Sequence, residues 1–249
     1  MFKNTTTEIS FKILILFIFW KLLKRNKSLK KYSKETQFSV YRSLMCFHFT
    51  FMSLENTLNY FTDGFKDIFY YKNRKISNLN YWFSAYIIFD LIMMFKMGNK
   101  RIDLYFHHFL CLSAFTICIS NDTYGYFSNI ILIAEAMSLV SGIDKMFMED
   151  KEMKKSTYCK KYRLFIIRYF RLPIWLTCII TTLYHSHKIS KSCWWLYLSS
   201  SVLMIGLDRF WEKKCLKAIN KYQKNYSKKK KIKMRLNIAK NLNLYNGTS

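Results

Sequence analysis

Three ionisable side chains stand close together at the start of one apolar stretch: Asp103, His107 and His108. Asp103 and His107 are four residues apart, so in a helix they share one face and the carboxylate can accept the imidazole N–H. That contact would fix the tautomer and stabilise the cationic imidazole. At ~3.6 residues per turn, His108 points about 100° away on the same turn. Such a group suits proton transfer or acyl transfer, so these three are the candidate catalytic residues.

The same three residues also allow a structural interpretation. If the helix enters a membrane, an Asp–His pair at its end can satisfy itself and fix the depth of the helix. A metal ion would need further ligands from other helices, because this spacing supplies too few. We therefore predict neither a metal nor a cofactor.

Further polar residues interrupt other apolar stretches, and they form a second group of candidates: Asp90, Glu135, His48, Arg168 and Arg171. Inside a membrane an Asp, Lys or Arg costs at least ~2.5–3.5 kcal/mol, so each needs a partner or a water-filled cavity. They are predicted to be polar intramembrane or lipid-pocket residues. For the two carboxylates the alternative is an interhelical hydrogen bond or ion pair, for example with Arg168 or Arg171, and for the arginines it is charge compensation.

Seven apolar segments are the elements that would position these residues, at 9–23, 44–61, 81–97, 104–119, 124–140, 164–184 and 194–207. Several are shorter than the ~20 residues that a spanning helix needs, but flanking Tyr, Trp and Lys can extend them. Residues 9–23 contain Lys12 and could instead form an anchor or interfacial helix. Pro173 should kink or break the sixth segment. The pattern predicts an all-α, polytopic transmembrane bundle of six or seven spans.

Basic residues alternate between the connections of these segments. When the connections are assigned to two sides in turn, one side and the C-terminal tail hold 31 Lys and Arg, and the other side holds 6. The positive-inside rule then places the C-terminus in the cytosol. A soluble helical protein that binds nucleic acid has no reason to show this alternation, so nucleic acid is not an expected partner.

The composition agrees with long helices. Among 249 residues, 51% are hydrophobic, and there are only 6 Gly and 1 Pro, which turns favour. The net charge of +26 fits attraction to anionic lipid as well as to nucleic acid, and an AT-rich genome would also inflate lysine. The seven cysteines include no C-x-x-C pair, which argues against a disulfide framework or a zinc site.

The run from Asp103 to His108 resembles the D-x-x-x-H-H element of the TLC-domain family, which includes ceramide synthases, TRAM proteins and smaller membrane proteins. Four other sequence elements resemble elements of the family and occur in the same order along the chain. They are Arg42-Ser43 with His48, Ser84-Ala85-Tyr86 before Asp90, Glu135 with Ser138, and Leu207-Asp208-Arg209-Phe210-Trp211. The resemblance covers about residues 41–216, and it adds Ser138 to the candidate pocket residues.

This resemblance implies a bundle of at least five membrane helices and a link to lipids. In ceramide synthases an acyl group passes from acyl-CoA to a sphingoid amine, which would make His107 or His108 the acyl-transfer residue or base and Asp103 its orienting group. A second His-Asp element of those enzymes is missing from residues 133–145. The chain is therefore more similar to the smaller proteins of the family. We expect lipid handling, sensing or control of membrane lipid composition, with N-acyl transfer from acyl-CoA as the alternative.

The domain organisation follows from these segments. Residues 1–40 would form an anchor-like helix and a basic loop, 41–216 the membrane domain, and 217–249 a basic cytosolic tail. The tail is expected to be solvated and partly disordered, or else to contact anionic lipid. Membrane lipids are the expected partners, and the endoplasmic reticulum or a related internal membrane is the expected location.

Overall fold

The computed structural model describes residues 2–62, 64, 74–120 and 125–246, and these residues are helical, with no strand among them. The all-helical prediction is confirmed. The elements are α1 (Phe2–Arg25), α2 (Lys34–Thr62), α3 (Arg74–Lys96), α4 (Ile102–Ser120), α5 (Gly125–Ile133), a 3₁₀ turn (Ala134–Ser138), α6 (Ser141–Glu149), α7 (Met153–Ile166), a π-helical turn (Ile167–Arg171), α8 (Leu172–Tyr184) and α9 (Lys191–Asn246).

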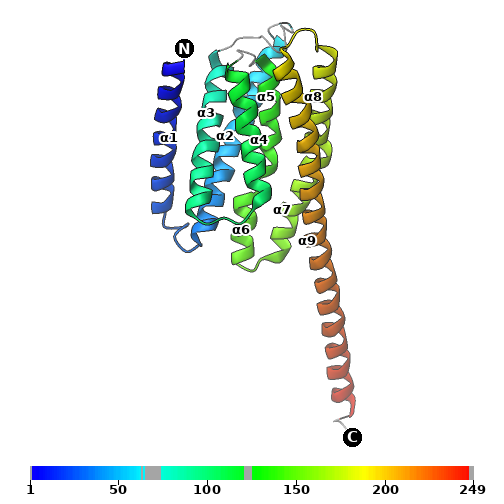
Figure 1. Ribbon diagram of the computed structural model, residues 1–249. Helices are drawn as coiled ribbons and strands as arrows, with labels where there is room; N and C mark the ends of the chain where they lie inside the picture. The colour runs from blue at the N-terminus through cyan, green and yellow to red at the C-terminus, as the bar shows by residue number, and fades with distance from the viewer. Residues whose placement is uncertain (1, 63, 65–73, 121–124, 247–249) are drawn as a thin grey trace.

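The helices stand side by side and run up and down along one bundle axis (Figure 1). α1 lies at the outer edge and packs mainly on α3, while α2 packs on α5, α6 and the 3₁₀ turn. α8 and the upper part of α9 form the opposite edge. α9 then continues well past the lower end of the bundle, as the orange-to-red helix in Figure 1.

The outward face of α2 is apolar and its inward face is partly polar. The outward side chains Phe47, Phe51, Leu54, Leu58 and Phe61 follow helical spacing and are 45–66% exposed. The buried residues of the same helix include Ser43, Cys46, Thr50, Ser53 and Asn56. This arrangement reverses the amphipathic pattern of a helix on the surface of a soluble protein.

One helical stretch in the described part of the chain, Met153–Tyr184, is long and apolar enough by composition to cross a membrane, and Ile102–Ile117 is apolar but shorter. The first stretch joins α7, the π-helical turn and α8. Its irregular turn ends two residues before Pro173, which lacks the N–H that a regular helix would use. The predicted kink is therefore accommodated as a π-helical turn rather than as a chain break.

Two expectations about connections and tail were wrong. Residues 141–163, expected as a basic loop, lie in a helical hairpin of α6 and α7. Gly142 permits this hairpin to approach α2, because a Cβ at this position would lie 2.5 Å from Cα of Val40. The C-terminal tail continues α9 as a helix to Asn246 instead of losing its order. Lysine is a good helix former, so the charge run does not end the helix.

Candidate functional site

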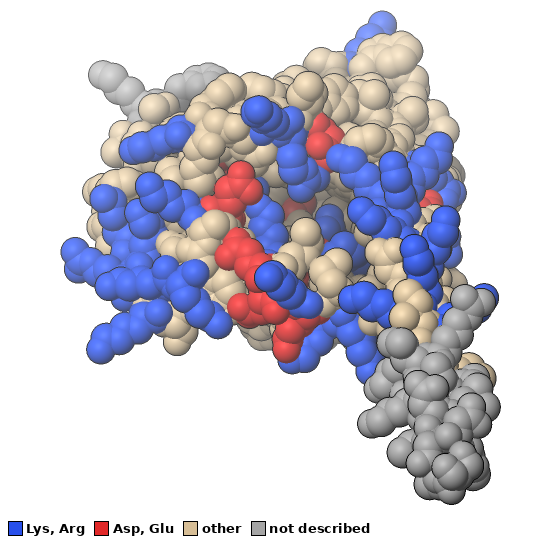
Figure 2. All heavy atoms as spheres, turned by 90° about the horizontal axis from the view of Figure 1, so that it is seen from below, with Lys and Arg blue, Asp and Glu red and all other residues tan. Residues whose placement is uncertain are grey.

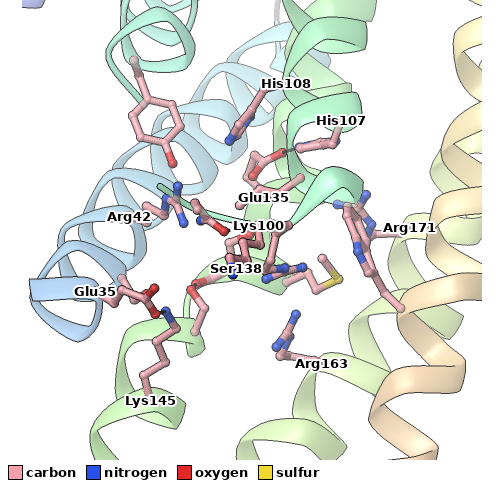
Figure 3. A pocket seen from close by; sticks show the side chains of 18 of the residues that line it. Glu35, Arg42, Lys100, His107, His108, Glu135, Ser138, Lys145, Arg163 and Arg171 are labelled. Carbon is pink, nitrogen blue, oxygen red and sulfur yellow. Dashed lines mark hydrogen bonds and ion pairs between the residues drawn. The ribbon is translucent and has the colours of Figure 1, made fainter. Parts of the chain in front are cut away.

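A cavity of about 490 Å³ lies at the lower end of the bundle. Its lining comes from α2, α3, α4 and the α3–α4 connection, the 3₁₀ turn, α6, α7, the π-helical turn and α9. His107, His108, Glu135 and Ser138 line it together with the arginines of α2, α7 and the π-helical turn (Figure 3). Exposed side chains such as Lys100 form its mouth. His107 and His108 from the first group of candidates thus share a cavity with Glu135, Ser138 and Arg171 from the second. The other four candidates do not line it: Asp103, Asp90, His48 and Arg168.

His108 lies against a buried ion pair. Arg42 donates from Nε to Oδ1 of Asp90 at 2.6 Å and from Nη2 to Oδ2 at 2.9 Å. Asp90 is fully buried, and its Oδ2 is 2.5 Å from Nε2 of His108. The ring is not aligned for a good hydrogen bond there, and Nδ1 of His108 has no hydrogen-bond partner in the described structure. Asp90 is therefore a support for His108 from behind the cavity.

His107 faces a different carboxylate. Its Nε2 is 3.7 Å from Oε1 of Glu135, a contact marked in Figure 3, and both side chains are nearly buried. The His107 ring also lies edge-on to Trp211 at 5.5 Å between centroids, and Sγ of Cys111 is 3.8 Å from its Nδ1. The interhelical contact expected for Glu135 as one alternative is thus made with His107 and not with Arg168 or Arg171.

The predicted pairing of Asp103 with His107 was wrong. Asp103 accepts a 2.8 Å hydrogen bond from Nε1 of Trp211 and a 2.6 Å bond from Nη2 of Arg101, and Nζ of Lys214 is 3.5 Å away. Because the same Trp211 contacts His107, Asp103 acts on the imidazole only through the indole. Asp103 and His107 do share one helix face, but the Asp103 carboxylate accepts its hydrogen bond from Trp211 of α9 instead.

Both arginines of the π-helical turn are compensated, as one alternative expected, although by carboxylates of α9. Arg171 is 1% exposed, and its Nε bonds Asp208 at 2.8 Å while Nη1 bonds the backbone oxygen of Ala134 at 2.7 Å. Arg168 reaches Glu212 at 2.7 Å and is directed away from the cavity lining. Nη2 of Arg171, by contrast, has no partner in the described structure, although Arg171 lines the cavity.

Of the remaining candidates, Ser138 lies at the cavity and His48 does not. Ser138 lines the cavity, and its backbone oxygen accepts hydrogen bonds from Ser43 and Ser141. His48 lies exposed on the outward face of α2, beside Phe47 and Phe51, so it belongs to the outer surface and not to the pocket.

Sequence reasoning missed the basic mouth of the cavity. Arg42, Lys100, Lys145 and Arg163 line it, and all four had served only as markers of membrane orientation or of family resemblance. Nε of Arg163 is buried without a partner among the described residues. Lys145 pairs with Glu35 at 3.3 Å, and burial holds the pKa of its amine below the ordinary 10.5 although Glu35 opposes that shift. The available signal was the density of basic residues around 97–101 and 145–163.

The arrangement has two chemical capacities. Since Arg42 balances Asp90, His108 can remain neutral with its proton on Nε2, which leaves the Nδ1 lone pair free to accept a proton. Nη2 of Arg171 and Nε of Arg163 are donors that lack acceptors. A ligand with oxygen acceptors would satisfy them. No group of three or more described His, Cys, Asp and Glu residues is placed to hold a metal ion.

Comparison with known families gives one match. Residues 30–217 match the family model described as TLC domain, which is well over half of the chain. A search of curated proteins found no match. A search of solved structures also found none.

Proposed function

Since the chain belongs to the TLC-domain family, we propose that it is a multi-pass membrane protein that binds a lipid with its polar headgroup in the cavity of His107 and His108. The observation that carries the proposal is the cavity itself. It joins unsatisfied donors to two buried imidazoles inside a bundle whose outer faces carry large apolar side chains. The family link to membrane lipids supports the class of ligand.

The surface of the bundle supports several spans. Besides the apolar stripe of α2, large exposed side chains occur on other helices, including Phe11, Phe95, Phe109, Ile180 and Trp195 at 51–65% exposure. In water such a belt would be costly, whereas lipid tails accept it. α1 to α4 have 24, 29, 23 and 19 residues. At 1.5 Å per residue these lengths match the ~30 Å hydrocarbon core.

The charge on the two ends supports an orientation. Figure 2 views the lower end, where Lys and Arg side chains surround a smaller acidic patch. The α1–α2, α3–α4 and α6–α7 connections and the extension of α9 all lie at this end (Figure 1). By the positive-inside rule this end faces the cytosol, together with the C-terminus and the cavity mouth. Residence in the endoplasmic reticulum or a related internal membrane is part of the proposal, and it rests on the family.

The donors around the cavity favour an anionic headgroup. Nη2 of Arg171, Nε of Arg163 and the exposed amine of Lys100 have no acceptor among the described residues. Charge-assisted bonds to a phosphate or carboxylate are stronger than those to neutral acceptors. A lipid whose anionic group enters from the cytosolic end would satisfy these donors while its chains remain in the membrane.

A second candidate is acyl transfer from acyl-CoA to an amine, and the free Nδ1 of His108 favours it. In this reaction His108 would take the proton of the amine as its nitrogen attacks the thioester carbonyl. The C–S bond would then break, and His107, paired with Glu135, would give a proton to the departing CoA thiolate. Glu135 and Asp90 would hold the two imidazoles, and Asp103 would position His107 through Trp211.

Binding is tested by purifying the protein in mild detergent and measuring co-purified lipids by native mass spectrometry. We expect Arg163→Gln/Lys100→Gln to lose anionic lipid, whereas Lys151→Gln/Lys154→Gln, at the same end but outside the cavity, keeps it. Equal loss of anionic lipid in both double variants would mean that lipid binds to surface charge and not to the cavity. An absence of co-purified lipid from the wild-type protein would also refute the proposal.

Acyl transfer is tested by lipid analysis of cells that express the protein. A new N-acylated amine that disappears in both His107→Ala and His108→Ala, at unchanged protein level, would establish the second candidate. An unchanged lipid profile with intact lipid binding leaves binding as the function and removes transfer.

A further inference from the structure

A second groove lies beyond the lower end of the bundle, between the α6–α7 hairpin and the extension of α9. Its volume is about 920 Å³, and none of its lining residues belongs to the cavity of His107 and His108. One wall carries Met148 and Met153, and the other carries Tyr222, Tyr226 and Ile232. We call it the tail groove.

Both walls of the tail groove carry exposed apolar side chains. Met148, Met153, Tyr226 and Ile232 are 46–58% exposed. On α9 the lining residues Ala218, Tyr222, Asn225, Lys229 and Ile232 follow helical spacing and therefore form one stripe. The stripe runs from Ala218 to Ile232, a rise of about 21 Å at 1.5 Å per residue, which is roughly four turns of a docked helix.

The rim of the tail groove is strongly basic. Seven lysines line it: Lys151, Lys154, Lys155, Lys160, Lys221, Lys228 and Lys229, of which Lys160 already pairs with Asp144 at 2.7 Å. The acidic residue in the lining is Glu152, and Lys155 binds its carboxylate at 2.9 Å. An occupant must therefore combine apolar side chains on one face with negative charge along both edges.

We propose that the tail groove docks an acidic amphipathic helix of a cytosolic partner protein. Apolar side chains of such a helix at i, i+3, i+4 and i+7 would contact the tyrosines and methionines, as in other helix-in-groove complexes. Its acidic flanks would meet the lysine rim. The unbranched methionines adapt to different apolar side chains, which favours a peptide surface.

The position of the groove argues against a lipid surface as occupant. Lys214 lies at the lower end of the bundle, where its Nζ is 3.5 Å from Asp103 at the start of α4. α9 continues in its own direction from there (Figure 1), so Lys228 is about 21 Å farther from the bundle by helical rise. The Debye length at physiological ionic strength is only about 8 Å, so a membrane around the bundle would attract Lys228 and Lys229 of α9 weakly.

Charge also argues against a second copy of this chain in the groove. The chain has a net charge of +26, so two copies repel each other. The acidic patch at the lower end is already occupied within the chain. Glu35 pairs with Lys145, and Glu149 accepts hydrogen bonds from Ser33 and Thr36.

The test uses the full-length protein in nanodiscs of neutral lipid and a fluorescent, Glu-rich peptide with leucines at i, i+3, i+4 and i+7. Fluorescence anisotropy is measured at physiological ionic strength. The comparison ligands are a scrambled peptide of the same composition, a single-stranded RNA oligonucleotide and anionic vesicles. We expect the amphipathic peptide to bind at least about tenfold more tightly than the scrambled one.

Matched variants locate the binding. Tyr222→Ser/Tyr226→Ser removes the apolar wall without changing charge, and we expect about a tenfold loss of peptide affinity. Lys228→Glu/Lys229→Glu should weaken binding more than Lys213→Glu/Lys217→Glu, which makes the same charge change on exposed positions of α9 outside the groove.

Several results would overturn the proposal. Equal binding of the scrambled peptide, or equal weakening by the two charge variants, would show unspecific attraction. Tighter binding of RNA with the same dependence on Tyr222 and Tyr226 would assign the groove to nucleic acid. Binding only to anionic vesicles would assign it to the membrane. None of these results depends on whether the cavity binds a lipid, so the two proposals fail separately.

Discussion

Two buried polar clusters occupy opposite ends of the same bundle, and they are built from different chemistry. Near the upper end, Asn129 of α5 donates to the backbone oxygen of Ser53 at 2.8 Å and accepts from Asn56 at 3.1 Å, and Ser53 donates to the backbone oxygen of Asn129. Asn80 donates to Ser128 at 2.9 Å nearby. This amide cluster contains neutral amides and hydroxyls.

The lower cluster contains charges instead. It joins Arg42, Asp90, His108, His107 and Glu135 beside the cavity. Charges are costly to bury and are kept where pairing or access for a ligand offsets that cost. Neutral amides hold helices together at lower cost. The upper cluster joins helices through neutral hydrogen bonds, whereas the lower cluster borders the cavity in which we propose a ligand.

The largest effect is expected where the ionic cluster loses its central carboxylate. Asp90→Leu leaves Arg42 buried without its partner and should lower the free energy of unfolding by roughly 3–5 kcal/mol. SDS titration of the purified protein measures this change. Arg42→Met/Asp90→Leu is the matched control and should recover most of the loss, because no lone charge remains. A double variant as unstable as the single one would contradict this account.

A smaller effect is expected in the amide cluster. Asn129→Leu removes the donor to Ser53 and the acceptor of Asn56, which costs roughly 1–3 kcal/mol for unsatisfied buried groups. The same titration measures it, and lipid co-purification should not change. Loss of bound lipid at unchanged stability would mean that the upper cluster also belongs to a ligand site, and the contrast between the two ends would disappear.

The exposed pair at the cavity mouth should contribute less to stability. Glu35→Gln breaks a 3.3 Å contact with Lys145 that is partly in solvent, and such pairs are worth about 0–1 kcal/mol. Because it frees a lysine at the mouth, we expect stronger retention of anionic lipid in native mass spectrometry. Weaker retention would show that Glu35 itself holds the headgroup or its counterion.

The smallest effect concerns pH at the lower end. Burial slightly raises the pKa of Glu149, but hydrogen bonds from Ser33 and Thr36 outweigh it and hold this pKa below the ordinary 4.5. A lowered folded-state pKa stabilises the protein above about pH 4.5 and loses that contribution as the pH falls through the folded value. The difference in thermal midpoint between wild type and Glu149→Gln should therefore shrink on acidification. A constant difference would contradict the assignment.

The sequence predicted most of the helices but not which side chains contact one another. The apolar segments located α1 to α5, α8 and the first part of α9, because burial of apolar surface dominates such stretches. The α6–α7 hairpin was missed, since its residues are too polar to form an apolar segment, although tertiary packing on α2 and α9 holds it. The sequence did not show that His48 faces outward, because an isolated polar residue in an apolar helix does not reveal which face it occupies.

The sequence by itself was enough to predict a helical chain with its basic residues on alternate connections. It also indicated the TLC-domain family and singled out Asp90, His107, His108 and Glu135 as polar residues within apolar helices. Only the tertiary structure decided which charge meets which. Spacing fixes neighbours within a helix, so it suggested Asp103 for His107. The actual partners, Glu135 for His107 and Asp90 for His108, come from other helices, and their approach depends on packing between segments distant in the sequence.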